Sequence, residues 1–248
     1  MTFCLGIKTK YGLIGLSDTR ITSGSETTTS KKVYVVNKQK HSFFIMTSGL
    51  RSVRDKAITY FSEVIERKDD SFSKLYQAVN EFGNQVKIVA QEDKVHLEEA
   101  GLNFNLYSII GGQLNEDAEP KLYLLYPQGN WIEIRRGTPF VIIGNSGFGN
   151  PVLRRSLQFD DSMEYALKCA FLAFDATRIS ANDVDFPIDT VILRNDDYHL
   201  KEKRFEQKEL EHVSAFWNER LKSAIAELPS DVLSSALVED LPSYSKEN

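Results

Sequence analysis

A threonine at position 2 directly follows the initial methionine. Methionine is normally removed when the next residue is small, so we expect Thr2 to carry a free α-amine. The ordinary pKa of such an amine is about 7.7–8.0, which leaves part of it neutral at pH 7. The amine can then accept the proton of the adjacent hydroxyl, so that one residue supplies both nucleophile and base. The alternative is that Thr2 is an ordinary strand residue, because threonine is common in strands.

Further residues that suit such chemistry lie where apolar runs begin or end. Asp18 ends GLIGLSD, Lys32 precedes VYVV, Gly49 follows FFIMTS, and Ser146 lies in GNSGFG. Each has an ordinary explanation, since a strand-end aspartate usually forms a turn and a lysine is usually solvated. The set gains meaning only if the fold brings the members together.

The first half of the chain combines short apolar strands with two helical periods. We expect strands at 3–9, 11–18, 31–38 and 41–49, a polar loop or edge at 19–31, and helices at 51–67 and about 71–92. Ser71 is the expected N-cap of the second helix.

The second half repeats this grouping of strands and helices. We expect strands at 103–112, 120–129, 130–137 and 140–147, helices at about 150–157 and 162–175, a closing hairpin at 187–196 and 199–207, and a helix near 208–227. Grouped strands and grouped helices favour packed layers over alternating βαβ units. The order predicts an α+β fold, a four-layer αββα sandwich, although composition alone does not separate it from a two-layer α+β fold. We expect one domain over 1–248, with a polar tail at about 229–248.

Composition restricts the function classes. The formal net charge of −5 and the pI of about 5.5 argue against a general nucleic-acid binder. Cys4 and Cys169 lie far apart in apolar runs and are expected to be small buried residues in a reducing compartment. The sequence predicts neither a signal peptide nor a spanning helix, so we expect a cytoplasmic protein without a membrane partner.

No motif in the sequence indicates a cofactor. The four histidines lie outside metal-binding spacings, and GNSGFG lacks the lysine of a phosphate-binding loop. Asp183, Asp185 and Asp189 cluster before TVIL. A metal site is one interpretation of this cluster, and a solvated loop is the favoured one.

Several segments, in this order, resemble one family. These segments are MT-C, GLIGLSDTRITSG, TTSKKVYVV, FFIMTSG and FDATRISANDVDFPIDTVIL. They are similar to the proteasome β-subunits, which are N-terminal nucleophile (Ntn) hydrolases, and within them to the bacterial Anbu (ancestral β-subunit) branch. The resemblance covers residues 2 to about 200. It implies the αββα fold and a threonine peptidase that cleaves peptides or unfolded proteins inside a homo-oligomer, either a ring or an open ring. It does not identify an ATPase partner.

The resemblance also implies roles for individual residues. Thr2 matches the nucleophile, and Asp18 matches the acid that orients the lysine and the chain start. Lys32 matches the buried lysine that keeps the amine neutral and stabilises the alkoxide, with Lys31 as the competing choice. Gly49 matches the residue whose N–H donates to the oxyanion.

Two further matches depart from the family pattern. Ser146 corresponds to the serine near the terminal amine, but its loop has one extra residue. The late Asp-x-x-Ser pattern is displaced: Ser180 follows Thr177 by three residues, whereas Asp175 is followed by Arg178 at that spacing. Either Asp175 or Thr177 fills the family's aspartate position.

Two other functions stay open at this point. The chain is either the peptidase or a proteasome-like shell that has lost catalysis and acts as a scaffold or binder, and an amidase acting on a small molecule is a third class. The polar side of the helix at 51–67 is either a solvent face or a contact between subunits. Phe216 and Trp217 favour either an interface or a contact within the chain.

Overall fold

The computed structural model describes residues 2–23, 26–68 and 72–229, which divide into a first compact unit that reaches Glu209 and a second from Leu210 onward. Its elements before residue 100 are β1 (Phe3–Thr9), β2 (Gly12–Asp18), β3 (Arg20–Ser23), β4 (Glu26–Thr29), β5 (Val33–Lys38), β6 (His41–Ser48), α1 (Arg51–Lys68) and α2 (Leu75–Glu99). The later elements are β7 (Tyr107–Leu114), β8 (Lys121–Leu125), β9 (Trp131–Glu133), β10 (Phe140–Gly144), α3 (Gly149–Ser156), α4 (Met163–Arg178), β11 (Ile188–Arg194), β12 (Lys201–Phe205) and α5 (Gln207–Ala226).

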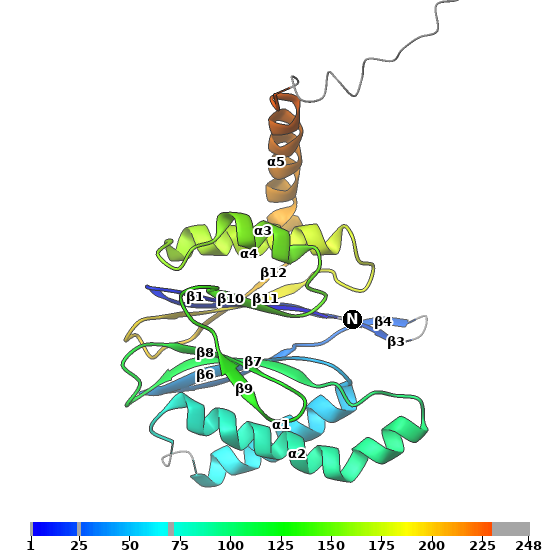
Figure 1. Ribbon diagram of the computed structural model, residues 1–248, viewed down its shortest axis with the longest axis vertical. Coiled ribbons are helices and arrows are strands. Elements are labelled where there is room, and N and C mark those ends of the chain that lie inside the picture. The colour runs from blue at the N-terminus through cyan, green and yellow to red at the C-terminus, as the bar shows by residue number, and fades with distance from the viewer. Residues whose placement is uncertain (1, 24–25, 69–71, 230–248) are drawn as a thin grey trace, which may run out of the picture. The chain divides into compact units, whose positions relative to one another are not determined.

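The first unit is a four-layer αββα sandwich, as the order of elements predicts. One sheet has the strand order β10-β1-β2-β11-β12 and the other β5-β6-β7-β8-β9, and β3 and β4 form a separate two-stranded ribbon. Helices α1 and α2 cover the second sheet, and α3 and α4 cover the first (Figure 1). All strand pairs in these described sheets are antiparallel.

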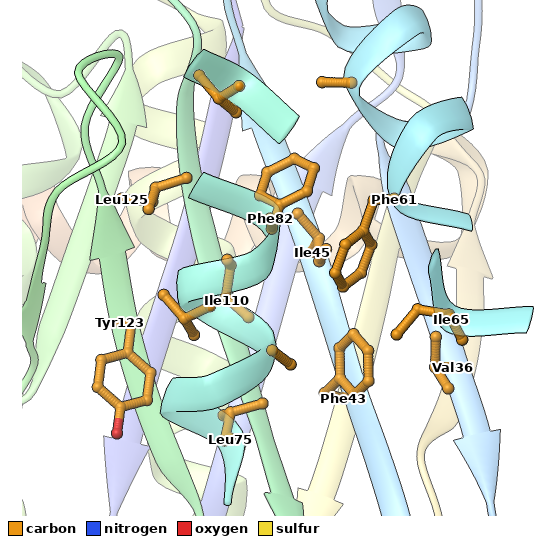
Figure 2. Packing of buried hydrophobic residues seen from close by; sticks show 14 of the residues in the cluster. Val36, Phe43, Ile45, Phe61, Ile65, Leu75, Phe82, Ile110, Tyr123 and Leu125 are labelled. Atoms are coloured by element: carbon orange, nitrogen blue, oxygen red, sulfur yellow. The ribbon is translucent and has the colours of Figure 1, made fainter. Parts of the chain in front are cut away.

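Apolar side chains fill both interfaces of the sheet β5-β6-β7-β8-β9. Between this sheet and its helices, Phe61 packs edge-to-face against Phe43 and Phe82, with ring centroids 6.1 and 5.2 Å apart (Figure 2). Between the two sheets, Cys4 and Phe44 belong to a second buried cluster. Because β1 and β6 are thus fixed from both sides, the residues at their ends have defined positions.

The observed elements correspond to the expected ones in order and type, but several ends differ. Helix α2 continues to Glu99, beyond the expected end near 92, β7 begins at Tyr107 where a strand was expected from 103, and β9 covers only Trp131–Glu133 of the strand expected at 130–137. Two further differences lie at 19–31 and at the start of α2. The segment at 19–31, expected as loop or edge, contains the β3–β4 ribbon. Helix α2 begins at Leu75 with Lys74 as N-cap, so the expectation of an N-cap at Ser71 is wrong, and Ser71 itself lies outside the described residues. The Leu75 N–H donates to the Asp117 carboxylate at 2.8 Å. A distant side chain therefore sets the start of this helix.

Two further features of the fold are the cap of α4 and the last part of the chain. Ser162 is the N-cap of α4, and its hydroxyl accepts the Tyr165 N–H at 3.2 Å. In the second unit the Arg220 guanidinium lies 5.3 Å from the centroid of Phe216. Whether Phe216 and Trp217 contact a neighbouring subunit stays a prediction, as does the single domain over 1–248. Within the described ranges, no helix combines the length and the apolar character needed to cross a bilayer.

Candidate active site at the start of the chain

The peptide group that joins Thr2 to Phe3 is held at both of its ends by neighbouring chain segments. The Asn145 N–H donates to the Thr2 carbonyl at 2.7 Å, and the Phe3 N–H donates to Asp18 Oδ1 at 2.8 Å. Phe3 is also the strand partner of Gly144 in β10. Gly144 has a φ of +85°, and a Cβ there would lie 1.9 Å from the Thr2 carbonyl oxygen. Only glycine allows this approach, so β10 and β2 together fix the chain start.

Asp18 and Lys32 form a buried ion pair beside this backbone. Lys32 Nζ lies 2.7 Å from Asp18 Oδ1, and the two side chains are 4% and 0% exposed. The second oxygen, Asp18 Oδ2, is buried and has no hydrogen-bond partner within the described residues. Burial raises the pKa of the Asp18 carboxyl, and the Lys32 ammonium and the Phe3 N–H counteract only part of this rise. A buried carboxylate thus connects the lysine to the backbone at Phe3.

The structure separates the two neighbouring lysines. Lys31 is exposed and forms an ion pair with Glu202 on β12. Lys32 is buried, because it immediately precedes β5 and points to the end of β2. Of the two, only Lys32 is joined to Asp18 by a hydrogen bond in the described structure.

Gly49 lies at the turn from β6 into α1. Its φ is +144°, and a Cβ there would lie 2.4 Å from the Asn105 carbonyl oxygen. Both the backbone conformation and the crowding require glycine. Gly49 is exposed, one residue after the end of β6. Its N–H is therefore on an exposed, fixed turn, as an oxyanion donor would need to be.

Ser146 follows the residue that binds the Thr2 carbonyl. Asn145 makes that contact, and the Ser146 carbonyl accepts the Asn150 N–H at 3.1 Å, where α3 begins. The loop after β10 is thus held between Thr2 and α3. This places half-buried Ser146 one residue from the Thr2 contact.

The late serine and its neighbours are engaged at the end of α4. The exposed Ser180 hydroxyl donates to the Ala176 carbonyl at 2.9 Å. The Thr177 hydroxyl donates to Ala173, and Arg178 pairs with Asp175 at 2.8 Å. In the described part of the chain, the Ser180 hydroxyl is thus bonded within its own helix end and not to the chain start.

Asp183 is a carboxylate to which the sequence patterns assigned no role beyond the acidic cluster before TVIL. Partial burial raises the pKa of Asp183, but hydrogen bonding and nearby positive charge, including that of Lys32, together outweigh it, and the net pKa lies below its usual value. Asp183 lies in the segment that leads into β11, whose first residue Ile188 pairs with Asp18. The only sequence signal was its place in the acidic cluster before β11.

The other two acids of that cluster bind arginines. Asp185 pairs with Arg20 at 3.0 Å, and Asp189 accepts two hydrogen bonds from Arg204 at 2.7 and 2.9 Å. Among the described residues, no group of three or more histidines, cysteines or acids is placed to hold a metal ion. Two of the three acids in the cluster therefore form ion pairs with arginines.

The family described as "Proteasome subunit" matches residues 2–188 of the chain. No curated protein matches the chain significantly.

Solved structures of Anbu proteins share the fold. The Anbu (Gly-1) mutant from Hyphomicrobium sp. strain MC1 is 27% identical, with a TM-score of 0.84 over 91% of this chain and 98% of that chain. The structure titled "Helical Assembly of the Anbu Complex from Pseudomonas aeruginosa" is 26% identical, with a TM-score of 0.85 over 92% and 97%. Anbu from Yersinia bercovieri, 24% identical with a TM-score of 0.85 over 92% and 97%, supports the fold alone. The chain belongs to the proteasome subunit family, and within that family to the Anbu (ancestral beta-subunit) branch.

Proposed function

We propose that this chain is a threonine peptidase whose nucleophile is Thr2 after removal of Met1. The observation that carries the proposal is the buried pair of Asp18 and Lys32, joined by a hydrogen bond to the backbone that follows Thr2. A buried ion pair is costly to desolvate, and perturbed buried charges gather at functional sites. The pair lies where an N-terminal nucleophile would need a cation.

The first step of the proposed reaction forms an ester. The Thr2 hydroxyl gives its proton to the α-amine, and the oxygen attacks the carbonyl carbon of a peptide bond. The Lys32 ammonium lowers the pKa of both groups, which favours the neutral amine and the developing alkoxide. The Gly49 N–H donates to the oxyanion, a contribution of about 3 kcal/mol. The C–N bond then breaks, and the leaving amine takes the proton held by the α-amine.

The second step returns the free enzyme. Water gives a proton to the α-amine and attacks the ester carbonyl, the C–O bond breaks, and the Thr2 oxygen is reprotonated. We include Asp183 in the proposal as the carboxylate that holds the amine of the processed Thr2, because it lies in the segment that leads to the pairing of Ile188 with Asp18 and is within reach of the Lys32 charge. Ser146 and Ser180 remain proposed members of the hydrogen-bond network around the amine.

The proposal includes assembly with further copies of this chain. The Pseudomonas aeruginosa relative is titled as a helical assembly, so we expect a homo-oligomer here, as a ring or an open ring. Peptides or unfolded proteins are the proposed substrates. Both cysteines are free and buried, which supports a reducing, cytoplasmic location.

A proteasome-like shell without catalysis is the second candidate. The observation that favours it is the hydroxyl of Ser180, which donates to Ala176 instead of extending toward the chain start. A site whose amine is poorly held would have little activity although the fold is intact.

The experiment that tests the proposal is an intact mass spectrum before and after addition of a peptide epoxyketone. This reagent needs a free α-amine and its adjacent hydroxyl. We expect loss of the Met1 mass and one adduct per chain. The adduct should be absent in Thr2→Ala. Retained Met1, or a free Thr2 that never reacts, would contradict the peptidase and favour the shell.

A further inference from the structure

A small cavity opens beside Lys32. Its volume is about 170 Å³, and it lies between the start of β5, the second half of β6 and the first turns of α1. Tyr34, Ile45 and Ile58 form apolar walls, and Lys32, Thr47 and Arg54 contribute polar groups. The cavity thus has the size and the mixed lining of a pocket for one side chain.

The cavity adjoins the Asp18–Lys32 pair. Lys32 lines it and also donates to Asp18. Thr47, which also lines the cavity, lies in β6 two residues before Gly49. The Thr47 carbonyl accepts a hydrogen bond from the Cys4 thiol at 3.7 Å. A substrate carbonyl that reaches both Thr2 and the Gly49 N–H would therefore lie close to this cavity.

The charge of Arg54 contributes to the electrostatics at Cys4 in β1. Burial raises the pKa of the Cys4 thiol to about 12, while the charges of Lys32 and, more weakly, Arg54 lower it. Cys4 lies two positions after Thr2 in the sequence. The positive charge of Arg54 thus acts at the start of β1.

Arg54 keeps hydrogen-bonding capacity for a ligand. Its Nε and Nη2 donate to a single oxygen of Asp55 at 2.8 and 2.6 Å, and Nη1 donates to the Lys31 carbonyl at 3.5 Å. A guanidinium has five N–H groups. Among the described residues, these contacts use one N–H on each Nη and leave the other available, and the side chain is 15% exposed.

The charges on the cavity wall favour an anion. Lys31, Lys32 and Arg54 line the cavity, with Asp55 as the acid among them. Glu202 and Asp18, the acids that pair with the two lysines, are not part of the lining. A cationic side chain entering the cavity would meet like charges, whereas a carboxylate would meet a partly unsatisfied guanidinium.

We propose that this cavity receives the substrate side chain on the amino side of the cleaved bond, and that Arg54 makes an acidic side chain the preferred occupant. The apolar walls contact the methylene groups, and the carboxylate binds the guanidinium. This inference rests on the proposed peptidase function and adds the class of substrate to it.

The test compares fluorogenic peptides that differ only in the residue before the cleaved bond. Glutamate, glutamine, leucine and lysine are used, since glutamine has the shape of glutamate without the charge. We expect kcat/KM for glutamate to exceed that for glutamine by about tenfold or more, and lysine to be the poorest. In Arg54→Met the ratio of glutamate to glutamine should fall toward one.

Arg51→Met is the matched control. Arg51 is on the same helix and contacts the same Asp55, at 3.4 Å, but it is exposed and does not line the cavity. Its glutamate-to-glutamine ratio should equal that of the unaltered protein. The melting temperature of both variants is measured first. If Arg54→Met does not fold, the ratio of kcat/KM for glutamate to that for glutamine in the unaltered protein still tests the acidic preference.

The outcomes separate this inference from the proposed function. An epoxyketone adduct on Thr2 together with faster cleavage of the leucine or glutamine peptide would overturn the acidic preference alone. So would an unchanged ratio in a folded Arg54→Met. No adduct and no cleavage of any peptide would overturn both proposals.

Discussion

Lys32 and Asp18 form an ion pair of 2.7 Å in which both side chains are buried. The oxygen of Asp18 that accepts from Lys32 also accepts the Phe3 N–H. The pair is therefore coupled to the first residue of β1, so that changes in either charge should affect both stability and the chemistry at Thr2.

Lys32→Met should damage stability and reactivity together. It leaves the Asp18 carboxylate buried without its cation, which costs about 3–5 kcal/mol in free energy of unfolding. We also expect no epoxyketone adduct on Thr2, because the cation beside the nucleophile is gone. Denaturant unfolding and intact mass spectrometry measure the two effects.

Lys31→Met is the control for that variant. Its ion pair with Glu202 is exposed, so its loss should cost about 0–1 kcal/mol. The double variant Asp18→Asn/Lys32→Met removes both charges and should recover part of the lost stability without recovering the adduct. An unchanged adduct rate in Lys32→Met would exclude Lys32 from the proposed mechanism.

Gly144→Ala should displace Thr2. The new Cβ would lie 1.9 Å from the Thr2 carbonyl oxygen at a φ of +85°. The backbone strain alone costs about 1–2 kcal/mol. A displacement of about 1 Å at the nucleophile lowers the adduct rate by about a hundredfold. Melting temperature and adduct rate are measured.

Gly147→Ala is the matched control in the same loop, because a Cβ there meets nothing within 4 Å. Its adduct rate should stay near that of the unaltered protein. Equal rates in the two variants would mean that the contact between β10 and Thr2 does not position the nucleophile.

Acid should inactivate the protein before it unfolds it. Burial raises the pKa of Asp18 above its ordinary value of 3.8, so its carboxylate is protonated at a higher pH than that of a free aspartate. Protonated Asp18 no longer attracts Lys32 by charge. Protonation of the α-amine already lowers the adduct rate in acid, so the rate should fall more steeply than the amine alone accounts for once the pH falls through the raised pKa of Asp18.

The effect of Asp18 on stability has the opposite sign. The folded protein binds this proton more tightly than the unfolded chain, so the carboxyl's contribution is complete below the unfolded pKa and is lost as the pH rises through the folded one. Glu119 and Asp183 have lowered pKa values, so each stabilises the fold above its unfolded pKa. That stabilisation is lost only as the pH falls through the lowered pKa of the folded protein. Near-UV circular dichroism and adduct rate across roughly pH 3–7 compare the two transitions, because this range starts below the ordinary carboxyl pKa values of about 4 and extends upward in the direction in which the pKa of Asp18 is raised. Coincident transitions would contradict this prediction.

Asp183→Asn should shift the alkaline dependence of reactivity. A carboxylate near an ammonium stabilises the charged form and raises the pKa of the amine. Removing that charge should move the rise of the adduct rate with pH down by about one unit. The measurement is the pH profile of the second-order adduct rate.

Asp160→Asn controls for the change in net charge. Asp160 is exposed and pairs with Arg136, close to Lys10 just beyond the far end of β1 from Thr2. Its pH profile should not move. An unmoved profile in Asp183→Asn would leave the amine without an assigned carboxylate and weaken the place of Asp183 in the mechanism.

Local patterns in the sequence were enough to predict most of the fold. The apolar run at 3–9 and the helical spacing at 51–67 correspond to β1 and α1, because strand and helix periods are local properties of a chain. The grouping of these elements predicted four layers. The predicted start of α2 was wrong, because the carboxylate that accepts the N–H of its first residue, Leu75, belongs to Asp117, 42 residues further along the chain.

The sequence by itself determined that Thr2, Asp18, Lys32 and Gly49 lie at the ends of strands, and their order indicated the family. The tertiary structure decided which charges meet: it buried Lys32 and exposed Lys31, set Asp183 within reach of the Lys32 charge, and put Arg54 on a cavity beside the chain start. The reason is physical. The energy of a charge depends on its burial and on its distance from other charges, and only the folded chain fixes both.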